Sequence, residues 1–238
     1  QHLGGDVYHG GFGYDADTKR AYADLSNTYI ALEGMALTEN AEDFRTGGEP
    51  AALDKEAAEE FVSKIQNREE SNDAEWVSDD PEQRGGFAYH PKESKAGTLT
   101  AEDGTVTFRS FGSMTYAGLL SLIYADVDRD DPRVQSAFDW AARHWTLEKN
   151  PGMGRQGLYY FYNVLSKALA VFGQEEFETA DGETVNWREA FVKKLVSLQK
   201  IDGDGHGYWV NEENRFWEGD PALVTAYTLI ALQVALRE

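Results

Sequence analysis

The residues best suited to bind an organic ligand are aromatic side chains that recur at one position in similar apolar segments. Four tyrosines occupy that position: Tyr29, Tyr116, Tyr162 and Tyr227. Phe111 and Tyr159 lie close to two of them in the sequence. Aromatic rings can line an apolar pocket for a small molecule, but rings at a repeated position also pack one helix against the next. The pattern therefore predicts either a pocket wall or a set of helix contacts.

A second group of residues resembles a calcium-binding loop. Asp202, Asp204 and His206 alternate along the chain and Glu213 follows, and an EF-hand loop places its oxygen ligands in a similar pattern. Histidine is a poor calcium ligand, and residues 214–219 do not read as the helix that leaves such a loop. We therefore expect no cofactor, with calcium at Asp202, Asp204 and Glu213 as the alternative to a simple acidic turn.

The composition limits the chemistry further. The 238 residues include 42 acidic and 22 basic side chains, for a net charge of −20, and no cysteine. Because nucleic acids bind to clusters of basic residues, DNA and RNA are not expected partners. Disulfides, zinc–thiolate sites and cysteine nucleophiles are excluded. No apolar run reaches the roughly 18 residues of a transmembrane helix. The acidic composition and the lack of cysteine favour a periplasmic or extracellular location.

The elements that would position these residues alternate along the chain. A glycine–aromatic turn at residues 10–14 recurs at 85–89, and apolar helices around the recurring tyrosines follow. Amphipathic helices come next, for example over residues 190–198. Helices that are apolar on nearly all sides are buried on all sides, so we expect an inner set wrapped by an outer set. An α-solenoid would show the same alternation without closing into a ring. Separately, an Asp-Gly turn between β-forming residues predicts a hairpin over 98–108.

Several of these motifs resemble the repeats of squalene and hopene cyclases. Gln199, followed by the turn at 202–205 and by Trp209, is similar to the glutamine-to-tryptophan repeat of that family. The segments 156–160 and 217–227 are similar to prenyltransferase/squalene-oxidase-repeat proteins. The resemblance covers essentially the whole chain. It implies an all-α fold, namely an α/α toroid in which inner and outer helices alternate.

The expected toroid has fewer helices than is usual for this superfamily, which has six inner and six outer ones. The sequence predicts four inner and three outer helices. We therefore expect residues 1–238 to form one domain of about four repeats, with the hairpin as an insertion and with an incomplete ring. Either the chain is a fragment or mature part of a longer protein, or another copy closes the ring. The oligomeric state does not follow from the sequence.

The resemblance also implies candidate catalytic acids. Hopene-type cyclases protonate an alkene with an aspartate cluster, in which crowded carboxylates keep a proton available. The string at 128–131 matches that cluster but precedes Pro132, where it is typical of a helix cap. Asp24 and Asp220 stand where the acid of the family would lie, and Glu218 is placed to pair with Asp220. Helix capping is the alternative role for these residues.

By the same resemblance, aromatic residues would line a cavity for an apolar isoprenoid and stabilise carbocations through their ring faces. His9 and His90 flank the two glycine–aromatic turns, where a structural hydrogen bond is the alternative role. The candidate substrate-binding residues are Tyr29, Phe111, Tyr116, Tyr159, Tyr162, Trp217, Tyr227, His9 and His90. The zinc site of protein prenyltransferases needs a cysteine and cannot exist here in its usual form.

Three functions from different classes are therefore open. An isoprenoid-binding toroid, with or without proton-initiated cyclase activity, would have a dry aromatic funnel, and this is the first hypothesis. A non-catalytic binding or scaffold domain would have a filled centre, since fold does not imply function. A carbohydrate-active enzyme would have an open cleft with aromatic platforms and a pair of carboxylates.

Overall fold

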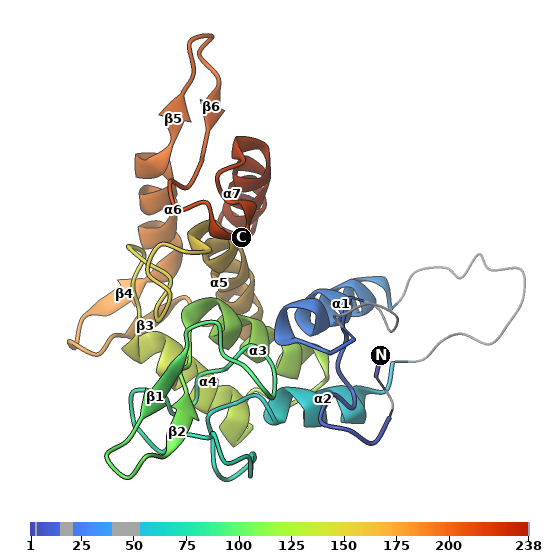
Figure 1. The fold of residues 1–238 in the computed structure, drawn as a ribbon. Coiled ribbons are helices and arrows are strands. Elements are labelled where there is room, and N and C mark those ends of the chain that lie inside the picture. The colour runs from blue at the N-terminus through green and yellow to red at the C-terminus, as the bar shows by residue number, and fades with distance from the viewer. Residues whose placement is uncertain (3, 15–20, 40–52, 238) are drawn as a thin grey trace, which may run out of the picture.

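The computed structural model describes residues 1–2, 4–14, 21–39 and 53–237, and within them helices and short hairpins alternate (Figure 1). The α-helices are α1 (Leu25–Thr38), α2 (Lys55–Ser63), α3 (Gly112–Tyr124), α4 (Pro132–Arg143), α5 (Leu158–Phe172), α6 (Trp187–Leu198) and α7 (Pro221–Ala235), and a short 3-10 helix, η1, covers Arg215–Trp217. The antiparallel hairpins are β1 (Thr98–Thr100) with β2 (Val106–Phe108), β3 (Glu176–Glu178) with β4 (Thr184–Asn186), and β5 (Lys200–Ile201) with β6 (Gly207–Tyr208).

The expectation of an all-α toroid is wrong. Besides its helices the described chain forms three two-stranded sheets, so the fold mixes α and β structure. The hairpin predicted over 98–108 is confirmed, with Leu99 opposite Thr107. The other two hairpins were not predicted, because each pairs only two or three residues on either side of a turn. An alternation of apolar and polar residues over only two or three positions does not distinguish a strand from a loop.

Four apolar helices form the centre of the molecule. The main contacts run from α1 to α3, from α3 to α5 and from α5 to α7, so that α1 and α7 stand at the two ends of this row (Figure 1). The remaining helices are amphipathic: α2 and α4 pack on α3, and α6 packs on α7. The core lies around α3 and α5, and α3 is buried along nearly its whole length.

The second glycine–aromatic turn shows how these helices are spaced. Gly85 has a φ of 93°, and a Cβ atom there would lie 2.1 Å from the carbonyl oxygen of Ser136 on α4. Phe87 is fully buried and its ring fills the space beside Gly118 on α3. The turn therefore needs glycine at position 85 because only glycine tolerates both this backbone conformation and this close approach.

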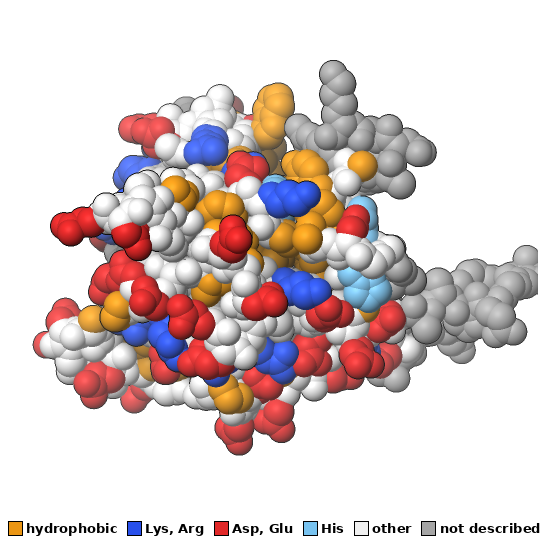
Figure 2. All heavy atoms as spheres, turned by 60° about the horizontal axis from the view of Figure 1, so that its bottom comes forward, with side chains coloured by type: hydrophobic (Ala, Val, Ile, Leu, Met, Phe, Trp, Pro, Cys, Tyr) orange, Lys and Arg blue, Asp and Glu red, His pale blue; other side chains and the backbone are white. Residues whose placement is uncertain are grey.

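The surface is dominated by carboxylates. Figure 2 shows Asp and Glu side chains over most of one face, with hydrophobic side chains gathered near its middle. This distribution agrees with the net charge of −20. Among the described helices, none combines the length and the apolar character that crossing a membrane requires.

Candidate functional site

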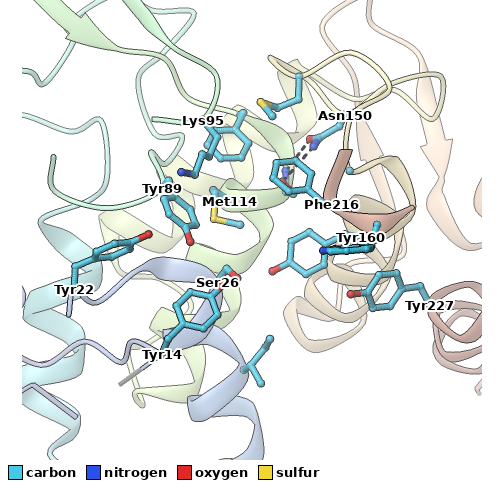
Figure 3. Close-up of a pocket in the computed structure, with 16 residues that line it drawn as sticks. Tyr14, Tyr22, Ser26, Tyr89, Lys95, Met114, Asn150, Tyr160, Phe216 and Tyr227 are labelled. Atoms are coloured by element: carbon cyan, nitrogen blue, oxygen red, sulfur yellow. Dashed lines mark hydrogen bonds between the residues drawn. The ribbon is translucent and has the colours of Figure 1, made fainter. Parts of the chain in front are cut away.

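A pocket of about 520 Å³ lies where the N-terminal ends of α1, α3 and α5 meet, with α7 at its side (Figure 3). This volume is within the range of small-molecule sites. Half of its lining is aromatic: five residues are tyrosines, namely Tyr14, Tyr22, Tyr89, Tyr160 and Tyr227. The other aromatic residues are Phe111, Phe216 and Trp217. Met114, Met153 and Ile30 add an apolar surface, and Ser26, Ser113 and Asn150 add polar groups.

The tyrosine hydroxyls make the pocket polar at its centre. Figure 3 shows Tyr22 and Tyr89 on one side and Tyr160 and Tyr227 on the other, with their hydroxyls directed toward the space between. The Tyr160 hydroxyl is buried, and in the described chain it has no partner within hydrogen-bonding distance and angle. Burial raises the pKa of Tyr160, although the nearby Ser26 hydroxyl acts in the opposite direction. Burial also raises the pKa values of Tyr89 and Tyr227, so these hydroxyls stay neutral at physiological pH and can donate or accept hydrogen bonds.

Two helix N-termini at the pocket are capped by side chains from distant loops. Neither Phe111 nor Gly157, which occupy the N-cap positions of α3 and α5, supplies a side-chain cap. Asn150 Oδ1 accepts a hydrogen bond from the Ser113 N–H of α3 at 3.0 Å, and Glu218 Oε1 accepts one from the Tyr160 N–H of α5 at 2.7 Å. The first turn of a helix leaves N–H groups without intrahelical partners, so both loops are tied to the helices that form the pocket floor.

Glu218 is a buried carboxylate held without a basic partner in the described chain. Its Oε2 accepts a hydrogen bond from Asn211 Nδ2 at 2.7 Å, and its Oε1 faces the first N–H groups of α5. Burial raises its pKa, while the hydrogen bonds from Asn211 and from the backbone of α5 oppose that shift. The positive end of the α5 dipole further stabilises the anion. Glu218 thereby anchors the segment 211–219 to the start of α5.

That anchored segment holds two aromatic residues in a strained conformation. Phe216 and Trp217 have φ values of 63° and 66°, and their side chains are 46% and 79% exposed. Left-handed backbone at a non-glycine residue costs roughly 1–3 kcal/mol and persists where neighbouring contacts impose it. Here Asn214 Oδ1 accepts a hydrogen bond from the Gly219 N–H at 2.8 Å, and the Asp220 N–H donates to the Trp217 carbonyl at 3.0 Å. The loop therefore presents two exposed rings at the pocket in a fixed geometry.

The three candidate acids all cap helices. Asp24 Oδ1 accepts a hydrogen bond from the Asn27 N–H of α1 at 2.9 Å, and Asp220 Oδ1 accepts one from the Ala222 N–H of α7 at 2.8 Å. Glu218 caps α5 as described above. None of the three lines the pocket, although Asp24 contacts the side chain of Tyr89, which does. The structure thus brings Asp24 and Glu218 close to the pocket floor in structural roles.

Only one charged side chain occurs among the described residues that line the pocket. It is Lys95, whose Nζ lies 2.8 Å from Glu93 Oε1 and 4.4 Å from the centre of the Tyr89 ring. Its charge is already balanced by Glu93, and the ring face holds it in place. The lining therefore offers a ligand aromatic surfaces and hydroxyl groups, and no unbalanced charge.

Of the nine residues expected to contact a substrate, Phe111, Trp217 and Tyr227 line the pocket. The other four aromatic residues, Tyr29, Tyr116, Tyr159 and Tyr162, are buried in the core. For example, the Tyr162 hydroxyl donates to the Leu147 carbonyl at 2.5 Å, and Lys167 Nζ donates to the Tyr29 hydroxyl at 3.1 Å. Tyr29, Tyr116 and Tyr162, at the recurring position, therefore belong to the packed core between the inner helices.

The two histidines lie outside the pocket lining. His90 stands behind the wall, with its ring centre 4.9 Å from that of Tyr22 and 5.4 Å from that of Tyr89. Its Nδ1 accepts a hydrogen bond from the Lys92 N–H at 3.1 Å, so Nε2 carries the proton and faces Glu93 at 3.4 Å. Burial lowers the pKa of His90. The Nδ1 of His9 is buried without a hydrogen-bond partner in the described chain.

The calcium-like string forms the tip of the β5–β6 hairpin. Asp202 Oδ1 accepts hydrogen bonds from the backbone N–H groups of Asp204 and His206 at 2.9 and 2.8 Å. The Glu213 N–H donates to Asn211 Oδ1 at 3.1 Å. Over the described residues, no cluster of three or more acidic or histidine side chains is arranged to hold a metal ion.

Sequence reasoning missed most of the pocket wall, but one signal for it was present. Tyr14 and Tyr89 are the last residues of the two glycine–aromatic turns, and both line the pocket. A recurring turn that ends in tyrosine could therefore have indicated two wall positions. Tyr22 and Lys95 lie in irregular loops and Phe216 lies in the short 3-10 helix η1. None of the three belongs to a repeated pattern, and nothing in the sequence marked them.

Comparison with known proteins adds no relative from which a role could be transferred. No protein-family model, curated protein or solved structure matches the chain.

Proposed function

We propose that the aromatic pocket binds a neutral saccharide. The observation that carries this proposal is the set of tyrosine hydroxyls directed into an open pocket whose walls and rim are aromatic. A sugar ring presents hydroxyl groups around its edge and carbon-bound hydrogens on its faces. It can therefore stack on exposed rings such as Trp217 while its edge hydrogen-bonds to the tyrosines.

The polar centre of the pocket favours a sugar over a hydrocarbon. Covering a hydroxyl without giving it a hydrogen bond costs roughly 1–3 kcal/mol. An isoprenoid chain would impose that cost at tyrosines of the lining such as Tyr22 and Tyr227. A saccharide replaces the lost water with its own donors and acceptors.

The charge of the lining favours a neutral ligand. Phosphate and diphosphate groups are usually bound by several unpaired basic side chains or by a metal ion. Lys95 is the one cation in the described lining, and Glu93 already pairs with it. Hydrolysis of a glycoside would need two carboxylates facing the ligand. Because Asp24, Glu218 and Asp220 act as helix caps, the proposal is for binding.

A neutral isoprenoid is the second candidate, and one observation favours it. Phe111, Met114 and Met153 give the lining apolar surface, which would accept a hydrocarbon chain. This ligand class was the first expectation from the sequence and stays a prediction.

The proposal is tested by titrating the protein with a panel of neutral mono- and oligosaccharides, followed by calorimetry or NMR shift changes. We expect saturable binding that Trp217→Ala weakens at least about ten-fold, because the stacking surface is lost. Tyr227→Phe, which removes a hydroxyl from a partly exposed residue of the lining, should weaken it by a smaller factor. Tyr124→Phe removes the same oxygen from a tyrosine of α3 outside the lining and serves as the matched control.

Native mass spectrometry with squalene and farnesol separates the two candidates. Stoichiometric isoprenoid binding that Trp217→Ala reduces, with no sugar bound, would replace the saccharide by the second candidate. If folded protein binds neither class, the assignment of this pocket as a ligand site is refuted.

A further inference from the structure

The residues that line the pocket differ widely in their exposure to solvent. At its mouth, Trp217 is 79% exposed and Tyr14 is 53% exposed. Phe111 and Met114 are only 3% exposed and Met153 is 7% exposed, although all three line the same pocket. A lining side chain that solvent barely reaches lies behind the others, so these three residues mark the inner end of the pocket.

The polar side chains at the inner end already have partners within the protein. Asn150 and Ser113 are both buried. Asn150 Oδ1 accepts a hydrogen bond from the Ser113 N–H, and Asn150 Nδ2 donates to Ser113 Oγ and to the Gln156 carbonyl at 3.2 Å each. The inner end therefore offers a ligand mainly the carbon and sulfur atoms of its phenylalanine and its two methionines.

Close packing fixes the walls of the inner end. The Gly112 N–H at the start of α3 donates to the Pro151 carbonyl at 2.9 Å, which ties the segment 150–157 to that helix. At Gly157, a Cβ atom would lie 3.3 Å from the ring of Phe216, so this ring packs on the same segment. The inner end is therefore an apolar recess between α3, the segment 150–157 and an aromatic ring of η1.

The middle of the pocket has the opposite character. Tyr22, Tyr89 and Tyr227 are half-buried, and Figure 3 shows their hydroxyls directed into the space between them. A ligand group that covers these hydroxyls must bond to them, whereas the recess is best filled by a group that leaves water readily. The volume of about 520 Å³ is in the range for drug-sized ligands, which are larger than a single sugar ring. One ligand can therefore occupy both regions.

We propose that the pocket binds an amphipathic glycoside, whose neutral sugar lies among the tyrosines and at Trp217 and whose apolar aglycone fills the inner end. This inference rests on the proposed saccharide function and narrows its ligand class. A free sugar would leave the inner end to water, and an isoprenoid chain would leave tyrosine hydroxyls without partners. The reverse orientation would set the sugar hydroxyls against Phe111, Met114 and Met153.

The three methionines of the chain can report on the inner end. Met114 and Met153 belong to it, whereas Met35 lies on α1 outside the lining. The full chain, isotope-labelled at its methionine methyl groups, is titrated with the phenyl and methyl glycosides of glucose, galactose and mannose and followed by NMR. The two members of each pair differ only in the aglycone.

We expect the phenyl glycoside of at least one sugar to bind at least about ten-fold more tightly than its methyl counterpart, because the phenyl ring leaves water. The ring current of the bound phenyl group should shift the methyl signals of Met114 and Met153. The signal of Met35 should stay in place and serves as the internal control.

Met153→Thr tests the same contact by mutation, with Met35→Thr as the matched control. We expect Met153→Thr to reduce the advantage of the phenyl over the methyl glycoside at least about three-fold, because apolar surface is lost from the recess. Met35→Thr should leave that advantage unchanged. If circular dichroism shows that Met153→Thr does not fold, the methyl signals of the wild type still decide.

Two results overturn this inference and leave the saccharide function standing. The first is equal affinity within every phenyl and methyl pair that binds. The second is tighter binding of phenyl glycosides without any shift at Met114 and Met153. If phenol alone binds as tightly as the phenyl glycosides, the sugar contributes nothing, and both the inference and the saccharide function are refuted. Folded protein that binds no glycoside refutes both as well.

Discussion

At the scale of single residues, the three carboxylates considered as acids cap helices around the pocket and do not line it. Asp24, Glu218 and Asp220 stand near helix starts in the sequence, where both catalysis and capping were open. In the structure each carboxylate accepts a hydrogen bond from an N–H group in the first turn of a helix, so all three act as caps. Glu218 differs from the other two because it caps a helix that begins 60 residues earlier in the chain, at Leu158. A sequence reading cannot find such a cap, since its partner is set by the tertiary fold.

Replacing Glu218 tests this anchoring role. Glu218→Ala would leave Asn211 and the first N–H groups of α5 without their acceptor, and we expect it to lower the free energy of unfolding by about 2–3 kcal/mol. Glu218→Gln keeps one acceptor oxygen and should cost less. Urea unfolding measures both. Asp204→Ala, at the exposed hairpin tip, should stay within about 0.5 kcal/mol of the wild type, and an equally small effect of Glu218→Ala would contradict the role.

Two partly buried histidines should also make stability depend on pH. Burial lowers the pKa of His90 and of His144 below the ordinary value of 6.5, so between the folded and unfolded pKa values the unfolded chain binds more protons. The contribution of these two histidines to the free energy of unfolding is therefore fully present above about pH 6.5 and is lost as the pH falls through their folded pKa values. Around His90, Glu93 and Asp24 raise the pKa and Lys95 lowers it, while burial is the largest effect.

His90→Asn separates this contribution from the rest. Asparagine can offer an oxygen to the Lys92 N–H in place of Nδ1 and does not titrate. We expect the loss of melting temperature between pH 7 and pH 5.5 to be smaller in His90→Asn than in the wild type. Carboxylates with lowered pKa values, such as Asp131, lose their stabilising effect at still lower pH, so they do not interfere in this range. An unchanged pH dependence in the variant would exclude His90 as a source.

At the scale of elements, the turns set the distances between helices. Gly85→Ala combines two costs, a left-handed φ of 93° and a Cβ atom 2.1 Å from the Ser136 carbonyl oxygen. Gly104→Ala has only the first cost, because its φ is 88° and a Cβ atom there meets nothing within 4 Å. We expect a loss of about 1 kcal/mol for Gly104→Ala and at least about 2 kcal/mol more for Gly85→Ala. Thermal or urea unfolding of both variants measures the difference, and equal losses would show that the turn can move away from α4.

The same elements show what the sequence could and could not predict. Helix periodicity, proline after an aspartate cap and the Asp-Gly turn predicted α4, α7 and the β1–β2 hairpin, because these signals act over a few residues. The pocket was placed at the recurring tyrosines of the inner helices, yet most of its wall comes from the loops before those helices. Phe216, for example, reaches it in a segment that the buried Glu218 ties to the start of α5. The resemblance to squalene and hopene cyclases stays a prediction.

At the scale of the whole molecule, the excess of acidic groups should govern the response to salt. With 42 acidic and 22 basic residues, repulsion among carboxylates opposes the compact state. Surface ion pairs such as that of Lys194 with Glu148, at 2.6 Å, act in the other direction but are worth only about 0–1 kcal/mol each. Salt weakens both effects, since the screening length falls from about 30 Å at 0.01 M to about 3 Å at 1 M.

Because acidic residues outnumber basic ones almost two to one, relief of repulsion should exceed the loss of ion pairs. We therefore expect the melting temperature to rise steadily from about 0.02 to about 0.5 M salt. NaCl and KCl at equal ionic strength should act alike, because screening depends on charge and concentration. A falling melting temperature would mean that the ion pairs dominate. An additional rise with millimolar CaCl₂ over MgCl₂ that Asp202→Ala removes would instead identify the β5–β6 tip as a calcium site, the alternative that the Asp202, Asp204 and Glu213 pattern left open.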